Sequence, residues 1–413
     1  MAAVLLCLGC DGGNNTADSG SPDTDTDTDT DTDTDTDTDT DADADTDTDA
    51  DADADADPMQ VSIAAGYDHG VVLVGTGVWG FGDDASGQVG DGGGFGRTFR
   101  DPTPVQVPSG VVFTMVASGD QFSVALDEDG RAYFWGRLGD SVEGAPVAVD
   151  MPADTVFVSI DAGRRFVAAL DEDGRAWAWG GDDDEALGNG AGGDESAPAA
   201  VVMPDGVRFT AISAGRSHVV ALDEDGNAWA WGDGETGALG NGGQVDESAP
   251  VSVTMPEGAR FLSIAAGAFF SLAVDADGNG WSWGGALDGR LGNGQDQVGA
   301  ATPTPVTMPA GVDFDAVYAG YDSAFATDAG GGSWIWATTS LDEDSDGVAD
   351  VVLTPVAFSA QDGAAVDAFS GGRCANLIAA GDAIYAWGCG TDGRSGLGTE
   401  DAIWTPTALT LAE

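Results

Sequence analysis

One sequence pattern repeats seven times between Gln60 and Trp387. Each copy has a hydrophobic segment ending in glycine, a second β-like segment, an acidic turn with glycine, and an aromatic-x-aromatic segment. Successive landmark glycines are 53, 44, 52, 52, 53 and 52 residues apart. A β-rich repeat with a period near 50 residues predicts a propeller in which each copy forms one blade. The landmark glycines are Gly66, Gly119, Gly163, Gly215, Gly267, Gly320 and Gly372.

The fourth copy shows why the pattern predicts stacked sheets. Asp225-Gly226 is typical of a tight hairpin turn, because glycine readily adopts positive φ. Side chains alternate along a strand, so Trp229 and Trp231 share one face while small alanines occupy the other. We therefore expect an all-β, seven-bladed propeller with four-stranded blades in residues 58–413. The expected repeats cover about 60–110, 111–154, 155–206, 207–258, 259–311, 312–363 and 364–413.

The repeat resembles that of the regulator of chromosome condensation family. The segments that carry the resemblance best are Ile63-Ala-Ala-Gly66, His69, Gly77-Val-Trp79, Phe81-Gly82 and Gly87-Gln-Val-Gly90. The resemblance implies a propeller fold, and bacterial relatives that inhibit β-lactamases set a precedent for secreted protein recognition. The founding protein is a nucleotide exchange factor with a basic chromatin-binding tail. Residues 1–57 are acidic here, which argues against an exchange-factor-like activity.

Residues 1–10 form a short apolar, signal-like segment that ends in Leu8-Gly9-Cys10. This ending resembles a bacterial lipoprotein signal, in which the cysteine becomes the lipid-bearing N-terminus. The resemblance predicts lipidation of Cys10 and an N-terminal anchor in a lipid bilayer of the bacterial envelope, at the outer membrane, the surface or the periplasm; secretion without an anchor stays open. The alternative is a short apolar segment with no role.

Residues 11–57 predict a disordered acidic tether. Asp alternates with Thr or Ala from Asp23 to Asp57, which puts like charges close together and leaves little apolar surface to bury. A diffuse calcium-binding brush is the alternative to a solvated spacer. Removing the 20 aspartates of residues 1–57 from the net charge of −59 leaves −39 for residues 58–413. Such a field repels phosphate backbones, so we expect no nucleic-acid partner.

The two histidines, His69 and His218, occupy equivalent positions in their copies. The other copies place Phe, Ser or Ala there, which indicates a packing position rather than a catalytic or metal-binding one. The sequence shows no catalytic constellation, so we expect no catalytic residue and no cofactor other than calcium. The calcium hypothesis rests on an unrepeated loop whose alternating carboxylates resemble calcium-binding loops, with an ordinary acidic surface loop as the alternative. Its candidate ligands are Asp342, Asp344, Asp346 and Asp350.

Two further expectations concern the last copy. Cys374 and Cys389 flank Gly381-Asp382 symmetrically, so a hairpin centred there places them opposite each other. A disulfide and two free thiols are both compatible with this position. The second expectation is that the final segment, Thr405 to Leu411, completes the blade begun by residues 60–66 and thereby closes the ring.

These features predict a monomeric, non-enzymatic envelope or surface lipoprotein whose propeller binds a protein partner or serves as a scaffold. Carboxylates in the loops at the blade ends are the candidate partner-binding groups, because a basic partner recognises them. A lyase or hydrolase using the funnel of the propeller is the alternative from another class. The candidate partner-binding residues are Asp182, Asp183, Asp184, Glu185, Asp194, Glu195, Asp246 and Glu247.

Overall fold

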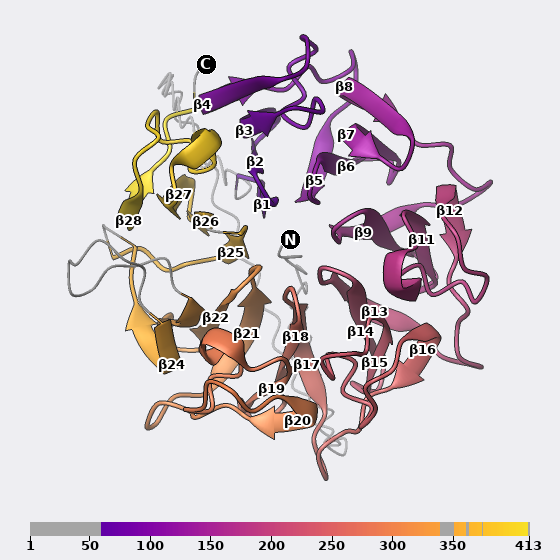
Figure 1. The fold of residues 1–413 in the computed structure, drawn as a ribbon, viewed down its shortest axis with the longest axis vertical. Coiled ribbons are helices and arrows are strands. Elements are labelled where there is room, and N and C mark those ends of the chain that lie inside the picture. Colours follow the sequence, from indigo (N-terminus) through magenta and orange to yellow (C-terminus); the bar gives the residue numbers. More distant parts are fainter. Residues whose placement is uncertain (1–58, 339–350, 361–362, 374, 412–413) are drawn as a thin grey trace, which may run out of the picture. The chain divides into compact units, whose positions relative to one another are not determined.

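Seven antiparallel sheets of four strands surround a central axis in the computed structural model of this protein (Figure 1). The structure describes residues 59–338, 351–360, 363–373 and 375–411, all within one compact unit. The predicted seven-bladed propeller with four-stranded blades is thus confirmed. Among these described residues, the helices are single 3₁₀ turns, and none is long and apolar enough to cross a membrane.

Each blade contains four strands that are consecutive in the sequence. Blades 1 to 4 contain β1 (Val61–Ala65), β2 (His69–Val74), β3 (Gly77–Asp84) and β4 (Arg97–Pro104); β5 (Phe113–Ser118), β6 (Phe122–Asp127), β7 (Ala132–Leu138) and β8 (Ser141–Ala148); β9 (Phe157–Ala162), β10 (Phe166–Asp171), β11 (Ala176–Gly180) and β12 (Glu195–Ala200); β13 (Phe209–Ala214), β14 (His218–Asp223), β15 (Ala228–Gly232) and β16 (Glu247–Ser252).

Blades 5 to 7 contain β17 (Phe261–Ala266), β18 (Phe270–Asp275), β19 (Gly280–Gly284) and β20 (Ala300–Pro305); β21 (Phe314–Ala319), β22 (Ser323–Asp328), β23 (Ser333–Thr338) and β24 (Val351–Phe358); β25 (Ala368–Gly371), β26 (Ala375–Ala380), β27 (Ala383–Gly388) and β28 (Ile403–Ala408). The 3₁₀ turns are η1 (Asp183–Glu185), η2 (Leu287–Gly289) and η3 (Thr391–Gly393). The first strand of each blade contacts the first strand of the next, so these strands line the central axis.

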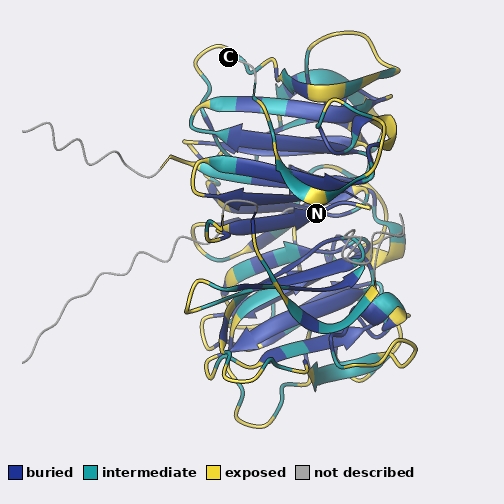
Figure 2. Ribbon diagram, turned by 90° about the vertical axis from the view of Figure 1, so that its left-hand side faces the viewer, coloured by how far each residue is buried: buried dark blue, intermediate teal, exposed yellow. Residues whose placement is uncertain are grey.

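Figure 2 shows exposed residues gathered in loops at the two ends of the strands. Three kinds of loop connect the strands within a blade. The collar loops join the first strand of each blade to the second, and the rim loops join the third strand to the fourth. Both lie at the same end of the strands. The hairpin loops, which join the second strand to the third, lie at the opposite end.

The hairpin loops form as the sequence predicts, with an added contribution from the preceding aspartate. In blade 4, Gly226 has a φ of 78°, and the Oδ1 atom of Asp223 accepts backbone N–H bonds from Asp225 and Asn227 at 3.0 and 2.9 Å. The Oδ2 atom accepts a bond from the indole of Trp229 at 3.0 Å. Burial raises the pKa of Asp223, but these hydrogen bonds outweigh it and leave the pKa below its usual value. Because its indole N–H donates to the Asp223 carboxylate in the hairpin loop, Trp229 is only half-buried, whereas Trp231 is fully buried.

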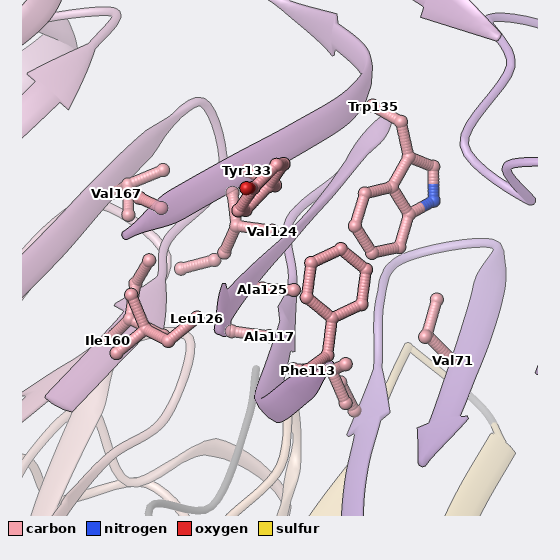
Figure 3. Packing of buried hydrophobic residues seen from close by; sticks show 14 of the residues in the cluster. Val71, Phe113, Ala117, Val124, Ala125, Leu126, Tyr133, Trp135, Ile160 and Val167 are labelled. Atoms are coloured by element: carbon pink, nitrogen blue, oxygen red, sulfur yellow. The ribbon is translucent and has the colours of Figure 1, made fainter. Parts of the chain in front are cut away.

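The core lies between neighbouring blades and is built on an aromatic pair. In blade 2, Phe113 of β5 stacks on Trp135 of β7 with ring centroids 6.2 Å apart and an interplanar angle of 15°. Figure 3 shows this pair beside Val71 of blade 1, and the same cluster continues to Ile160 of blade 3. Blades 3 to 6 repeat the stacked pair. Large and small side chains therefore interlock between sheets, as the alternation of Trp and Ala predicts.

Four of the buried tryptophans also hydrogen-bond to the rim loop of the preceding blade. Each indole N–H donates to a backbone carbonyl, which contributes roughly 1 kcal/mol per bond. The donors and acceptors are Trp135 and Gln88 (2.9 Å), Trp231 and Ala186 (3.0 Å), Trp283 and Ala238 (2.8 Å), and Trp336 and Arg290 (3.1 Å). Among the described residues the buried indole N–H of Trp179 has no partner, since blade 2 has a rim loop of only two residues, 139–140.

The predicted mode of ring closure is wrong. The C-terminal strand β28 pairs with β27 of its own blade, because β4 already occupies the outer edge of blade 1. Blades 1 and 7 instead pack face to face through a shared cluster that includes Ile63, Phe81 and Leu377. The backbone N–H of Ala65 donates to the Ser370 hydroxyl at 2.9 Å across the same junction.

Candidate functional site

The collar loops are joined into a ring around the central axis by backbone hydrogen bonds between blades. Described residues supply six of these N–H···O bonds, one for each junction from blades 1 and 2 to blades 6 and 7. The donor–acceptor pairs are Tyr67 and Gly119 (3.3 Å), Asp120 and Arg164 (3.0 Å), Arg164 and Arg216 (2.9 Å), Arg216 and Gly267 (3.3 Å), Ala268 and Tyr321 (3.1 Å), and Tyr321 and Gly371 (3.0 Å).

This ring explains the landmark glycines of the repeat. A Cβ atom on Gly119 would lie closer than 3.0 Å to the carbonyl oxygen of Gly163, and one on Gly163 would lie equally close to that of Gly215. Real Cβ atoms almost never approach other atoms so closely. The glycines are therefore required by the close approach of neighbouring blades, and they fix the position of the side chains that follow them.

Those side chains surround a small pocket on the central axis. Tyr67, Asp120, Arg164, Arg216 and Tyr321 line it together with the collar glycines, and its cavity volume is about 20 Å³. Pockets that enclose small-molecule ligands usually measure about 300–1,000 Å³. The pocket therefore has room for about one water molecule and is far too small for an enclosed metabolite.

Aromatic rings and guanidinium groups pack against one another around this pocket. The rings of Tyr67 and Tyr321 meet edge to face at 5.6 Å, and Phe269 and Tyr321 do so at 6.3 Å. The guanidinium of Arg216 lies 5.1 Å from the ring centre of Phe269, and that of Arg373 lies 4.9 Å from that of Tyr67. Such cation–π contacts hold the arginines in place while leaving the N–H edges of the guanidinium accessible.

Some arginines of the collar form ion pairs, whereas two have no carboxylate partner among the described residues. The Nε atom of Arg164 lies 3.2 Å from the Asp120 carboxylate, and the Arg290 guanidinium lies 2.6 Å from that of Asp322. Among the described residues, no carboxylate oxygen lies within 4.0 Å of the guanidinium groups of Arg216 or Arg373.

Burial changes the charge balance of the same loops. It raises the pKa of Asp120 above its usual value, against the opposing effect of Arg164 and Arg216. Burial likewise raises the pKa of Asp322 despite the nearby Arg290, and that of Tyr321. The carboxyls are therefore more readily neutralised than ordinary aspartates.

The predicted partner-binding acids all lie in or beside the rim loops of blades 3 and 4. Most of them hold the loops in shape. The Asp182 carboxylate accepts backbone N–H bonds from Leu187 and Gly193, Asp194 accepts one from Asp182, and Asp246 accepts one from Gly234. Glu195 and Glu247 accept bonds from asparagine side chains, and Asp183 pairs with Arg165. Among the described residues, the exposed side chains of Asp184 and Glu185 have no hydrogen bond or ion pair.

The histidines occupy packing positions, as predicted. The Nε2 atom of His218 lies 3.0 Å from the Ser271 hydroxyl of blade 5, which donates to the Ala238 carbonyl at 2.8 Å. The hydroxyl has one proton, so Nε2 carries the proton of the imidazole. His69 and Ser123 form the same arrangement between blades 1 and 2, at 2.9 Å. Burial lowers the pKa of His218 to about 4 and that of His69 to about 3.

Several predicted sites fall outside the described residues. These are Cys10, the calcium candidates Asp342, Asp344, Asp346 and Asp350, and Cys374. The register of β26 and β27 pairs Ala375 with Gly388, which is the register on which the disulfide prediction rests. Cys389 is disulfide-bonded, and its pairing with Cys374 stays a prediction. Within the described part of the chain, no group of three or more His, Cys, Asp or Glu residues is placed to hold a metal ion.

The arginine–aromatic cluster of the collar was not predicted from the sequence. Its signal is the residue directly after each landmark glycine, where small residues give way to Tyr67, Asp120, Arg164, Arg216, Ala268, Tyr321 and Arg373. Comparing the copies at the histidine position identified packing residues, because that position points between blades. The position directly after each landmark glycine lies two residues before the histidine position. Comparing the copies there would have identified it as the variable, solvent-facing position.

The fold and the collar together define a seven-bladed β-propeller that presents a rigid polar face around its axis. Models of the regulator of chromosome condensation (RCC1) repeat match parts of this chain: one matches residues 77–126, 173–222 and 225–274, and a second matches 157–185 and 209–238. The predicted family resemblance is thereby confirmed.

Relatives with such repeats include receptors and larger enzymes. The Ultraviolet-B receptor UVR8 of Arabidopsis thaliana is 27% identical over 81% of this chain and 66% of its own length. The E3 ubiquitin-protein ligase HERC2 of Homo sapiens is 27% identical over 57% of this chain, which corresponds to 4% of that ligase. This chain therefore spans less than two thirds of either relative.

Solved structures share the fold at lower identity. Yeast RCC1 (Prp20) in complex with Kap60 has a TM-score of 0.71 and 19% identity, with 86% of this chain and 84% of that chain covered. Human WBSCR16 has a TM-score of 0.68 and 18% identity, with 78% and 87% covered. At these identities the likeness concerns the fold alone.

Proposed function

We propose that this protein is a non-enzymatic lipoprotein of the bacterial cell envelope whose propeller binds a protein partner on its collar and rim face. The observation that supports this best is the separation of charge on that face. Aromatic rings and arginines, two of which pair with Asp120 and Asp322, surround the axis, whereas Asp184 and Glu185 stand on the rim without an ion pair among the described residues. A rigid face with such a charge pattern suits recognition of a protein surface with the complementary pattern.

The relatives support a role in binding. One solved structure shows yeast RCC1 (Prp20) in complex with Kap60, and another study of Prp20 concerns its binding to Gsp1p and histones. These are partners of that protein, and they illustrate that a propeller of this kind presents binding surfaces. For this chain, the rim carboxylates favour a partner with basic groups at the matching distance from the axis.

Capture of partners with the full chain as bait tests the proposal. The bait would be cross-linked in native envelope, and the captured proteins would be identified by mass spectrometry. We expect at least one protein that is retained by the wild type and lost from a D184N/E185Q variant. A matched control, E224Q/D225N, removes two exposed carboxylates from a hairpin loop at the opposite end of the strands and should retain the partner. Equal capture by all three baits would contradict rim recognition.

The lipid anchor is tested separately. The proposal rests on the Leu8-Gly9-Cys10 segment and the acidic tether that follows it. Cells grown with labelled palmitate should incorporate the label into the wild-type protein and not into a Cys10→Ser variant. Label that persists in the variant would place the lipid elsewhere, and an unlabelled wild type would rule out the anchor.

A further inference from the structure

The chain contains four Asn-Gly dipeptides, and three of them recur at one position of the rim loops. The rim-loop pairs are Asn189-Gly190, Asn241-Gly242 and Asn293-Gly294, in blades 3, 4 and 5, and Asn279-Gly280 lies where a hairpin loop meets β19. An asparagine followed by glycine readily loses its side-chain amide, because glycine has no Cβ to shield the backbone nitrogen that attacks it. These four positions are therefore candidates for a modification made by the chain's own backbone.

The reaction joins the backbone to the side chain. The glycine nitrogen loses its proton and forms a bond to the Cγ atom of the asparagine, and the bond from Cγ to Nδ2 breaks as ammonia leaves with that proton. Water then opens the resulting cyclic imide at either carbonyl, which yields aspartate or isoaspartate. The rate in a folded protein therefore depends on how firmly the structure holds the glycine N–H and the asparagine amide.

The glycine N–H groups are held alike in the three rim loops. Each donates to a backbone carbonyl in the fourth strand of the next blade, and each asparagine Oδ1 accepts the backbone N–H two residues further on. The N–H···O pairs are Gly190 and Ser248, Gly242 and Ala301, and Gly294 and Leu353, each at 2.9 Å. The three asparagines are also half-buried alike. The attacking nitrogen and solvent access therefore do not distinguish the three sites.

The leaving nitrogen is held differently. A carboxylate accepts a hydrogen bond from Nδ2 at three of the four asparagines. The donors and acceptors are Asn189 and Glu195 (3.2 Å), Asn241 and Glu247 (3.3 Å), and Asn279 and Asp275 (3.1 and 3.0 Å). Such a bond must break before ammonia leaves, and the nearby negative charge also opposes loss of the glycine proton. The carboxylate therefore protects these three amides.

Asn293 lacks this anchor. The acceptor in blades 3 and 4 lies six residues after the asparagine, and in blade 5 that position is Gly299, which offers no acceptor. Among the described residues, the Nδ2 atom of Asn293 has no hydrogen-bond acceptor, and the Gln295 N–H positions the amide by donating to Oδ1 at 3.0 Å. The side chain can therefore turn its Cγ atom toward the Gly294 nitrogen at lower cost than its counterparts in the other two loops.

We infer that Asn293 is a modification site, at which the folded protein deamidates spontaneously while the three anchored asparagines persist. The inference is independent of the proposed partner binding. Aspartate at this position adds a negative charge to the rim of blade 5. Isoaspartate adds a methylene group to the backbone, which displaces the Gly294 nitrogen from the Leu353 carbonyl and loosens the rim loop from blade 6. The modification therefore changes one rim loop as the protein ages.

Peptide mass spectrometry of the full chain, aged in mildly alkaline buffer, tests the inference. We expect Asn293 to lose its amide about three- to tenfold faster than Asn189 and Asn241, which is the effect of one hydrogen bond on a rate. In urea that unfolds the chain, the three rates should be equal, because all three asparagines lie in the local sequence Leu-Gly-Asn-Gly. Equal rates in the folded chain would overturn the inference.

Removal of an anchor is the second test. Glu247→Ala should raise the rate at Asn241 about three- to tenfold, to that of Asn293. Glu235→Ala is the matched control and should leave the rate at Asn241 unchanged, because this exposed glutamate of the same rim loop has no side-chain hydrogen bond or ion pair among the described residues. Asn293 in the Glu247→Ala chain should keep its rate, which excludes general unfolding. An unchanged rate at Asn241, or an equal rise at Asn293, would contradict protection by the anchor and overturn the inference.

Discussion

The junction between blades 4 and 5 differs from that between blades 2 and 3 in its buried polar contacts. At the first, the Ala238 carbonyl accepts bonds from Trp283 and Ser271, and Ser271 also contacts His218. At the second, Trp179 has no partner, and Phe122 lies where His218 would be. Both junctions keep the stacked aromatic pair and the collar bond. Apolar packing and the collar therefore suffice to hold a blade in the ring, and the polar network adds stability on top.

The largest effect is expected where the two junctions are alike. Gly119→Ala and Gly215→Ala each place a Cβ closer than 3.0 Å to the carbonyl of the next landmark glycine. Overpacking against backbone that cannot move should cost about 3 kcal/mol or more in either case. Urea denaturation measures both. Gly94→Ala is the control, because a Cβ there meets nothing within 4 Å. If the Gly119→Ala variant were as stable as the control, the close contact in the collar would not contribute to the stability of either junction.

Lowering the pH should weaken the junction between blades 4 and 5, which contains His218, and leave the junction between blades 2 and 3 unchanged. Burial holds the pKa of His218 at about 4, below its usual value of 6.5. The unfolded chain therefore binds more protons below pH 6.5, and the free energy of unfolding falls as the pH drops from 6.5 toward 4, by about 3 kcal/mol for this residue. Carboxylates titrate in the lower part of this range, so a matched variant is needed.

The variant H218F/S271V supplies that match, because it installs the Phe and Val found at positions 122 and 167 of the other junction. Its free energy of unfolding should fall less steeply between pH 6.5 and 4 than that of the wild type. Parallel pH profiles for the two proteins would show that His218 is not the cause.

A smaller difference is expected between two rim-loop glycines with similar backbone conformations. Gly240 has a φ of 66°, and a Cβ there would lie 2.7 Å from the Trp283 indole nitrogen. Gly139 has a φ of 59° with nothing within 4 Å. Gly139→Ala should cost only the left-handed backbone penalty of about 1–2 kcal/mol, and Gly240→Ala about 2 kcal/mol more. Thermal unfolding of both variants checks the difference, and equal costs would mean that the indole contact contributes nothing.

The smallest effect isolates one hydrogen bond. Trp283→Phe and Trp179→Phe remove similar packing, but only the first loses a bond to a rim carbonyl. The second removes a buried N–H that has no partner, which relieves a desolvation cost. Trp283→Phe should therefore be the more destabilising change by about 1–2 kcal/mol in urea denaturation. The reverse order would show that the indole bond is replaced by another acceptor.

The repeat determined the fold because its two landmarks report on packing. Gly215 and Trp231 have counterparts in every copy, always 15 or 16 residues apart, since each must meet a neighbouring blade in the same way. Blade number, strand order and the hairpin turn could therefore be predicted from spacing alone. The closure of the ring could not, because pairing of the last strand depends on whether the first blade already has a fourth strand. The variable segment containing Arg97–Pro104 gave no clear sign of one.

The candidate site was harder to predict for a related reason. Carboxylates such as Asp182 and Asp246 are abundant in the rim loops, and the sequence does not distinguish an acid that accepts loop N–H groups from one that faces solvent. The collar cluster is formed by residues about 50 positions apart, each ordinary in its own copy. Only the ring brings Arg216, Tyr321 and Arg373 to one axis.

Because β28 stays in its own blade, blades 1 and 7 share no strand, and their boundary is held by the packed cluster of Ile63, Phe81 and Leu377 and by the Ala65–Ser370 hydrogen bond. The order of the chain and the order of the ring are therefore separable. A circular permutant that begins at the connector before β13 and joins the present ends through a linker would keep all seven sheets intact. Circular permutation can therefore join the acidic segment to a different blade while the strands of all seven blades stay unchanged.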